Sequence, residues 1–387
     1  MPGGQRIVIV GASIGGLTAA ETLRQEGFDG EVILIGDERH APYNRPPLSK
    51  QIIMGDWEPE DAGIRRGTEI DDLGIELRTS CAAESLDAPG RVLRTSQGEL
   101  PFDELIIATG TEPRRHPLLP EALTLRTVDD ALTIREGLRA ARRVAVVGPG
   151  ILGSEMASAA RKYGADTQLI GRSGTLTFGG VGALLSAQLV DLHEANGVDL
   201  ALSAEIVGAS ADAGGTSILF ADGRSERADL VVAMIGGVPR TRWLQSSTLT
   251  VDNGVVCDAT GSAAPGISAV GDVAAWADPF TGRLVRVEHQ SNAIEQAIAV
   301  AMRIVHGEQG SRPVPLFWSE LHGTRITAFG WFDPQLPLAP LDESPTVLVS
   351  RDESGRTHGA VGWGAPPREF RVARAAVAES STLAPLP

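Results

Sequence analysis

Residues 6–16 read RIVIVGASIGG, an apolar, β-branched run that leads into a glycine-rich turn. Apolar residues then recur at helical spacing through Leu17, Ala20 and Leu23, and residues 31–35, EVILI, form a second run of strand type. A strand, a glycine turn, a helix and a second strand make up the β-α-β unit that binds dinucleotides. The start of the chain therefore predicts a Rossmann-like fold.

The glycine turn supplies the chemistry of this unit. Gly11 allows the bend from strand to helix, and Gly16, preceded by Gly15, lets the helix pack close to the sheet. Ser13 replaces the middle glycine of the usual motif, but its small side chain still lets backbone approach a phosphate. The free N–H groups of the helix start favour a pyrophosphate. Asp37 ends the second strand, where a carboxylate can accept both ribose hydroxyls of an adenosine. A strand, turn and helix without a ligand is the alternative.

The same pattern occurs again in the middle of the chain. Residues 143–147, RVAVV, precede GPGILG at 148–153, and a further strand is expected at 167–170. Each copy is followed by a buried strand with a glycine at its end, at 105–110 and 230–236. Two such units in one chain predict two nucleotide-binding folds. The small residues of these segments that we assign to cofactor binding are Ala108, Thr109 and Gly110 in the first unit, and Gly148, Gly150, Gly153 and Gly236 in the second.

The composition limits the classes of function. A chain of 387 residues favours two or three domains, and its net charge of −15 argues against a non-specific nucleic-acid binder. The sequence has no apolar stretch of membrane-spanning length and no signal-peptide pattern, so we expect a cytoplasmic protein without a membrane anchor. Cys81 and Cys257 form no C-x-x-C pair, which argues against a dithiol redox centre. The seven histidines show no ligand spacing, so no metal site is expected.

A proline-rich segment follows the first unit. Residues 42–50 read PYNRPPLSK, and its prolines fix the backbone and exclude a helix before Leu48. This rigid segment can hold Arg45 and Lys50 in place, and a cation near the N5/O4 edge of a flavin would stabilise the reduced ring. A surface loop with solvated charges is the alternative.

Together, these motifs resemble the FAD-dependent ferredoxin reductases that serve oxygenases and cytochromes P450. The resemblance rests on G-x-S-x-x-G at 11–16, Asp37, RPPLSK at 45–50 and Ala-Thr-Gly at 108–110, and extends to about residue 331. It implies an α/β protein with two Rossmann-like dinucleotide-binding domains in a glutathione-reductase-like arrangement and a small α+β C-terminal domain. The implied boundaries are 1–112 and 239–312 for a discontinuous FAD-binding domain, 113–238 for an NAD(P)H-binding domain, and 313–387 for a C-terminal interface domain.

The resemblance also assigns flavin contacts. Asp272, after an apolar strand, would bind the ribityl chain of FAD, and Val287, Glu288 and His289 would lie beside the isoalloxazine ring. Trp318 would lie near the flavin and the docking surface of the partner, although simple core packing is an alternative for this side chain. The family often has an aromatic residue where Gln290 stands. It usually continues after Phe-Trp-Ser with Asp-Gln-Tyr, whereas this chain has Glu-Leu-His at 320–322.

In the second fold, the resemblance implies that Glu155 and Glu288 flank the nicotinamide, where a carboxylate can accept the carboxamide N–H. A carboxylate for the NADH ribose is expected after the strand at 167–170, but the chain has Gly-Arg-Ser at 171–173. Arg172 suits a 2′-phosphate and hence NADPH, or is simply solvated. The family usually has arginines a few positions further along the chain, where this sequence has Thr175 and Gly179. The choice between NADH and NADPH therefore stays open.

The predicted function is a reductase that moves a hydride from NAD(P)H to FAD and then passes single electrons to a ferredoxin-type iron–sulfur protein, with Lys50, Glu155 and Glu288 at the reaction site. We expect a monomer or homodimer with no nucleic-acid or membrane partner. Two alternatives stay open. The altered segment 320–322 and the short third domain suggest a flavin oxidase or small-molecule reductase, and Arg172 suggests a flavoprotein with a degraded nicotinamide site. Arg368, Arg371 and Arg374 share one helical face and are candidates for contact with an acidic ferredoxin, with an ordinary amphipathic helix as the alternative.

Overall fold

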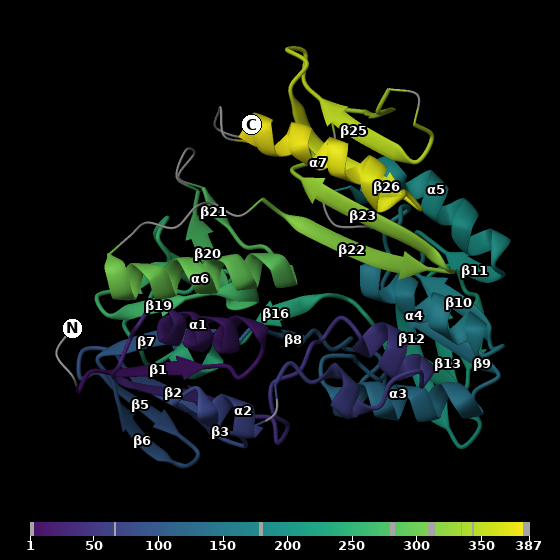
Figure 1. Ribbon diagram of the computed structural model, residues 1–387. Coiled ribbons are helices and arrows are strands. Elements are labelled where there is room, and N and C mark those ends of the chain that lie inside the picture. Colours follow the sequence, from purple (N-terminus) through teal and green to yellow (C-terminus); the bar gives the residue numbers. More distant parts are fainter. Residues whose placement is uncertain are drawn as a thin grey trace.

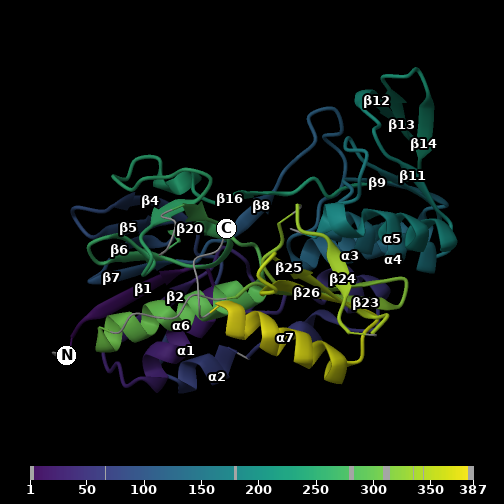
Figure 2. The same cartoon turned by 90° about the horizontal axis from the view of Figure 1, so that it is seen from above.

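The computed structural model describes residues 4–65, 67–177, 181–278, 283–307, 314–333, 335–342 and 344–381. Figure 1 shows two folds side by side, with the C-terminal elements above the second one. In both folds the helices cover one side of a parallel sheet and a small antiparallel sheet covers the other, as Figure 2 shows.

The first fold is built on a six-stranded sheet in the order β18-β19-β7-β1-β2-β3, parallel except for β18. Alternate residues of β1 face opposite sides: Ile7 and Ile9 pack against α1 and α6, whereas Val8 and Val10 pack toward the small sheets. The strands of the main sheet are β1 (Arg6–Val10), β2 (Glu31–Ile35), β3 (Ile75–Arg78), β7 (Glu104–Ile107), β18 (Ser262–Ala264) and β19 (Ile267–Ala269). The other elements of this fold are α1 (Ile14–Gln25), α2 (Gly67–Asp72), α6 (Gln290–His306), β4 (Ala83–Asp87), β5 (Val92–Thr95), β6 (Gly98–Pro101), β17 (Val255–Cys257), β20 (Ala274–Ala277) and β21 (Leu284–Val285).

The second fold has a four-stranded parallel sheet in the order β11-β10-β9-β15. Val144 and Val146 face the helices, and Ala145 and Val147 face the three-stranded sheet on the other side. The strands are β9 (Arg143–Val147), β10 (Asp166–Ile170), β11 (Val198–Ala201) and β15 (Leu230–Ala233). The covering elements are α3 (Val128–Ala140), α4 (Ile151–Lys162), α5 (Gly182–Ala195), β12 (Ile206–Asp212), β13 (Gly215–Phe220) and β14 (Ser225–Ala228).

A five-stranded antiparallel sheet, β22-β23-β26-β25-β24, forms the C-terminal part. One side packs against α7, and Leu321, Ile326 and Val361 on the other side join the core of the second fold. This C-terminal sheet therefore packs on the second fold. Its elements are β22 (Leu316–Leu321), β23 (Thr324–Gly330), β24 (Leu338–Pro340), β25 (Val347–Arg351), β26 (Thr357–Trp363) and α7 (Pro367–Ser381).

The two folds are joined by a short antiparallel pair, β8 (Thr111–Pro113) and β16 (Gly237–Pro239). The chain leaves the first fold along β8 and returns beside it along β16, at the centre of Figure 1. Single helical turns complete the described structure: η1 (Leu48–Ile52), η2 (Pro59–Ala62), η3 (Arg242–Leu244) and η4 (Gly271–Val273).

The predicted fold class is confirmed: this is an α/β chain with two Rossmann-like folds and a small α+β part. The strands expected at 6–10, 31–35 and 143–147 have these bounds. The buried strands expected at 105–110 and 230–236 end earlier, at Ile107 and Ala233. Beyond these ends Gly110 and Gly236 turn the backbone to φ values of 67° and 90°, which takes the chain out of the sheet.

Candidate active site

Both glycine turns have the same tight geometry. Gly11 and Gly148 each have a φ of 121°, and a Cβ atom there would overlap the carbonyl oxygens of Ala108 and Met234. A Cβ on Gly16 or Gly153 would likewise overlap the carbonyl of its own turn, which explains why these two glycines pack the helix onto the strand. The first turns of α1 and α4 contain no acidic residue. Each helix therefore presents its positive end without a charge that would repel a phosphate.

A single large cavity of 1710 Å³ connects the two turns. Typical pockets for one small ligand measure about 300–1,000 Å³, so this cavity has room for more than one such group. A smaller adjoining cavity of 100 Å³ lies at the end of β2, beside Asp37 and Thr109. The predicted site residues that line the large cavity are Ser13, Gly15, Arg45, Lys50, Ala108, Gly110, Gly148, Gly150, Glu155, Arg172, Gly236, Asp272, Val287, Glu288, His289 and Trp318.

Glu155 lies where all three parts of the chain meet. Its carboxylate is 3% exposed and lies 2.8 Å from Nζ of Lys50, which is 12% exposed. The hydroxyl groups of Ser49 and Ser319 also donate to Glu155. Ser49 and Lys50 come from η1, which begins directly after the two prolines of the first fold, as predicted. A buried carboxylate needs such donors, because an unpaired charge away from water is strongly unfavourable.

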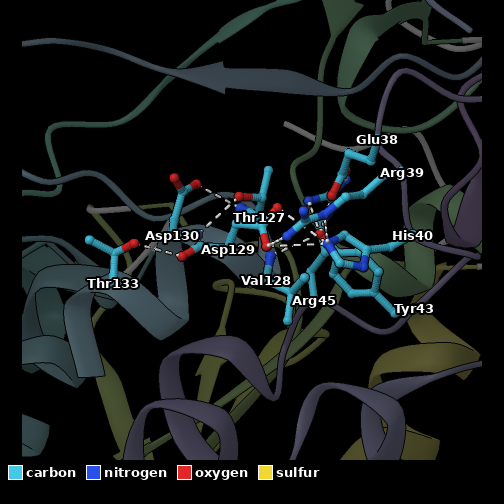
Figure 3. Close-up of polar contacts among 10 residues, drawn as sticks. All are labelled: Glu38, Arg39, His40, Tyr43, Arg45, Thr127, Val128, Asp129, Asp130 and Thr133. Carbon is cyan, nitrogen blue, oxygen red and sulfur yellow. Dashed lines mark hydrogen bonds and ion pairs between the residues drawn. The ribbon is translucent and has the colours of Figure 1, made fainter. Parts of the chain in front are cut away.

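Arg45 is fixed by a network at the start of α3, shown in Figure 3. Its guanidinium lies 2.7 Å from Glu38 and 5.3 Å from the centre of the Tyr43 ring. The Tyr43 hydroxyl accepts from the backbone N–H of Val128 at 3.1 Å and donates to Glu38. Burial raises the pKa of Tyr43, with Glu38 adding to the effect, so the phenol stays protonated. The alternative of a loop with solvated charges is wrong for Arg45 and Lys50.

Arg126 was not predicted from the sequence, yet it lines both cavities. It lies 3.5 Å from Asp272, which is in η4 after β19, and its backbone carbonyl accepts from Arg45. Burial raises the pKa of Asp272, and the positive charge of Arg126 opposes this shift. The signal in the sequence was a weak one, an arginine directly before the N-cap residue Thr127.

Asp37 also has a partner that was missed. Its carboxylate lies 2.6 Å from Arg240, which follows β16 and lines the smaller cavity with it. Burial would raise the pKa of Asp37, but the hydrogen bond and charge of Arg240 prevail and lower it. The hydroxyl of Thr109 donates to the Arg240 carbonyl at 3.0 Å. The Asp37 carboxylate is therefore held by a residue of the segment that returns from the second fold.

The segment at 287–289 lines the same cavity as the two glycine turns. Glu288 pairs with Arg286 at 2.6 Å, and Arg286 also donates to the Asp272 carbonyl at 3.0 Å. His289 stacks on Phe317 with ring centres 5.0 Å apart, and burial lowers the pKa of His289. Gln290, in place of the aromatic residue of the resemblance, donates to Asn44 at 2.9 Å. This glutamine therefore ties α6 to the proline-rich segment.

Trp318 lies at the edge of the cavity and is 38% exposed. Nζ of Lys50 is 5.0 Å from its ring, and the guanidinium of Arg325 is 4.8 Å away. These contacts exclude the alternative of simple core packing for this tryptophan. The neighbouring segment 320–322 packs differently: Leu321 is buried in the core of the second fold, and the backbone N–H of His322 donates to Ser158 of α4 at 2.8 Å.

The residues directly after β10, at 171–173, include no carboxylate. Gly171 is buried, whereas Arg172, Ser173 and Thr175 are exposed. Gly179 lies outside the described residues. The described ranges also contain no cluster of three or more histidine, cysteine, aspartate or glutamate side chains that would suit a metal ion. Within the same ranges, no helix is long and apolar enough to cross a membrane.

Two Rossmann-like folds that open onto one cavity suit a class of proteins that binds two nucleotide cofactors, and comparison with known proteins identifies this class. The family model described as pyridine nucleotide-disulphide oxidoreductase matches residues 5–297. The chain belongs to this family, and within it to the ferredoxin reductases that its motifs resemble. It is therefore an oxidoreductase, and the predicted use of FAD and a nicotinamide nucleotide is confirmed at the level of the family.

Individual relatives are similar along most of their length. The chain is 32% identical over 375 residues to the ferredoxin–NAD(+) reductase subunit of the benzene 1,2-dioxygenase system of Pseudomonas putida, covering 95% of this chain and 91% of the relative. It is 33% identical over 331 residues to rhodocoxin reductase of Rhodococcus erythropolis, covering 84% and 78%. The structure of putidaredoxin reductase in its covalent complex with putidaredoxin has a TM-score of 0.89 at 28% identity, covering 98% and 94%.

Proposed function

We propose that this chain takes a hydride from NAD(P)H, passes it to FAD, and then delivers single electrons to a ferredoxin-type iron–sulfur protein that serves an oxygenase or a cytochrome P450. The observation that carries the proposal is the cavity shared by both glycine turns, with Lys50 and Glu155 between them. The named functions of the benzene dioxygenase subunit and of rhodocoxin reductase support the electron-transfer role.

The first fold fits FAD, because the start of α1 lines the large cavity at Ser13 and Gly15 and has no acidic residue in its first turn that would repel a pyrophosphate. In this proposal Gly11, Ser13, Gly15 and Gly16 hold the pyrophosphate, and Asp37 holds the ribose. FAD, when bound, accepts a hydride and releases electrons one at a time. The remaining residues that would contact FAD are Arg45, Lys50, Ala108, Thr109, Gly110, Asp272, Val287, Glu288, His289 and Trp318.

Lys50 and Glu155 have separate tasks in this proposal. The Lys50 cation is held in a nearly water-free position, where it favours negative charge on a neighbouring ring. Glu155 lies behind the second glycine turn and can accept the carboxamide N–H of a nicotinamide, as can Glu288. Gly148, Gly150, Gly153 and Gly236 would shape the rest of this binding site. Hydride transfer needs placement and electrostatics rather than an acid or a base.

We further propose domain boundaries at 112/113, 238/239 and 312/313. We also propose a cytoplasmic location. The proposed oligomeric state is a monomer or homodimer, without nucleic-acid or membrane partners. The β8–β16 pair supports the first two boundaries, since both crossings between the folds lie there. Cys81 and Cys257 are both buried and free, which suits a reducing compartment. Light scattering of the purified protein measures the oligomeric state.

The test is an anaerobic titration of the purified FAD-loaded protein with NADH and NADPH, followed by addition of an iron–sulfur acceptor. Bleaching of the flavin and reduction of the acceptor are the expected results. Turnover with oxygen but with no ferredoxin would favour the oxidase alternative. Absence of bleaching with both coenzymes would contradict the proposal and favour a degraded nicotinamide site. The altered segment 320–322 no longer favours the oxidase, because its Leu321 and His322 pack against the second fold.

A further inference from the structure

The end of β10 is closed to an acidic side chain by its neighbour in the glycine turn. Gly171 directly follows β10, where a carboxylate would bind the adenosine ribose of NADH. A Cβ atom on Gly171 would lie 2.9 Å from both Cβ and Cγ of Pro149, and 3.2 Å from Leu202. Real Cβ atoms do not approach other atoms so closely, so the proline ring occupies the space that an aspartate or glutamate needs.

Pro149 cannot easily move aside. Its carbonyl accepts from the backbone N–H of Thr177 at 2.8 Å and from the Thr177 hydroxyl at 3.3 Å. Gly148 N–H donates to Ile170 at 2.8 Å and Gly171 N–H donates to Ala201 at 2.9 Å, so the backbone on both sides of the contact is also fixed. The pyrrolidine ring has no rotamer that would relieve the overlap.

Arg172 is the next residue, and its environment is the opposite of that of Gly171. Its side chain is exposed and lines the large cavity together with Gly150 and Ser173. Within the described ranges it has no ion pair and no hydrogen bond. A guanidinium without a partner at this position matches a phosphate, which offers two or more oxygens to its planar donors. Glu205 lines the same cavity, and the backbone N–H of its neighbour Ala204 donates to the Gly171 carbonyl at 2.9 Å.

We infer that Pro149, Gly171 and Arg172 together select NADPH over NADH: the proline excludes a carboxylate at position 171, and Arg172, which takes the place that Asp37 has in the first fold, binds the adenosine 2′-phosphate. This inference rests on the proposed function, because it names the coenzyme of that same site. It separates the chain from relatives such as the benzene dioxygenase subunit, whose printed name specifies NAD(+).

The first experiment measures binding without turnover. The FAD-loaded protein is titrated calorimetrically with 2′,5′-ADP and with 5′-AMP, which differ in the 2′-phosphate. We expect 2′,5′-ADP to bind roughly tenfold to a hundredfold more tightly, and Arg172→Gln to remove this difference. Arg224→Gln is the matched control, because Arg224 is an exposed arginine of the same fold that does not line the cavity. Equal affinities, or a difference that survives in Arg172→Gln, would overturn the inference.

The second experiment tests the steric part through kcat/KM for NADH. Gly171→Asp alone should give no gain, whereas Gly171→Asp with Pro149→Gly should raise kcat/KM for NADH, because only this double variant removes both ring atoms, Cβ and Cγ, that overlap the new Cβ atom. An equal gain in both variants would overturn the role of Pro149. A larger loss of kcat/KM for NADPH in Glu205→Gln than in Arg172→Gln would overturn the role of Arg172. If 2′,5′-ADP binds as expected but neither coenzyme bleaches the flavin, the inference holds and the proposed function fails.

Discussion

Nζ of Lys50 lies 2.8 Å from Oε1 of Glu155, so an ion pair joins the first fold to the second at the shared cavity. Because Ser49 and Ser319 donate to the same carboxylate, all three parts of the chain contribute to one cluster. This cluster is the most direct physical link between the two proposed cofactor sites, and it makes the effect of individual substitutions predictable.

Lys50→Met should slow flavin reduction by NAD(P)H by about tenfold to a hundredfold, because it removes the cation from a poorly solvated site. Stopped-flow absorbance at the flavin band measures the rate. Lys162→Met is the control, since the chain has only these two lysines and Lys162 is exposed on α4. Equal rates in Lys50→Met and the wild type would show that the cation does not act on the flavin.

Gly11→Ala should give a colourless protein, because the added methyl group would overlap the Ala108 carbonyl and displace the turn that holds the pyrophosphate. Gly98→Ala provides a matched control: Gly98 has nearly the same φ, 120°, but nothing lies within 4 Å of its added Cβ atom. We expect the control to lose only about 1–2 kcal/mol of stability through backbone strain and to keep its flavin. The ratio of flavin to protein absorbance distinguishes the two, and a yellow Gly11→Ala protein would contradict the prediction.

Mild acid should weaken the contact between α5 and the C-terminal sheet. His193 on α5 is fully buried, and its Nδ1 lies 3.0 Å from Nε2 of His322. Burial, followed by the charge of its neighbours, lowers the pKa of each histidine from 6.5 to about 4. The unfolded chain therefore binds protons below pH 6.5 that the folded protein does not, so stability is full above this pH and falls as the pH drops toward 4.

For His193 alone, the pKa shift predicts a loss of about 2 kcal/mol between pH 7.5 and pH 5. Urea unfolding at the two pH values measures it. The variant His193→Leu should show a smaller loss over the same range, since the buried titrating group is gone. An unchanged pH dependence in His193→Leu would assign the acid sensitivity to other groups.

Charge reversal on α7 should weaken binding of an acidic ferredoxin. Arg368, Arg371 and Arg374 are all exposed on this helix, and the guanidinium of Arg374 also lies 4.8 Å from the centre of the Phe329 ring. The double variant Arg368→Glu/Arg371→Glu should raise the KM for ferredoxin several-fold at low salt, while turnover with ferricyanide stays the same. Arg94→Glu, in the small sheet of the first fold, is the control. An unchanged KM would exclude this face as a docking site.

The sequence predicted the parts of the structure that are local in the chain. The two glycine turns, their flanking strands and the proline-rich segment need only neighbouring residues, so their patterns are legible. The pairs that complete the site join residues far apart, such as Asp37 with Arg240, and their positions follow from the packing of whole folds. For the same reason, the change at 320–322 suggested an altered docking surface, although Leu321 faces the core of the second fold.

The β8–β16 pair also affects the order of events during synthesis. In the first sheet, β19 pairs with β7, and the whole second parallel sheet lies between these two strands in the sequence. A ribosome therefore releases the second fold before the first fold has received β19 and α6. The first fold therefore stays incomplete while the inserted fold is synthesised. During this time the edge of its sheet at β7 is unpaired, which exposes the nascent chain to aggregation there.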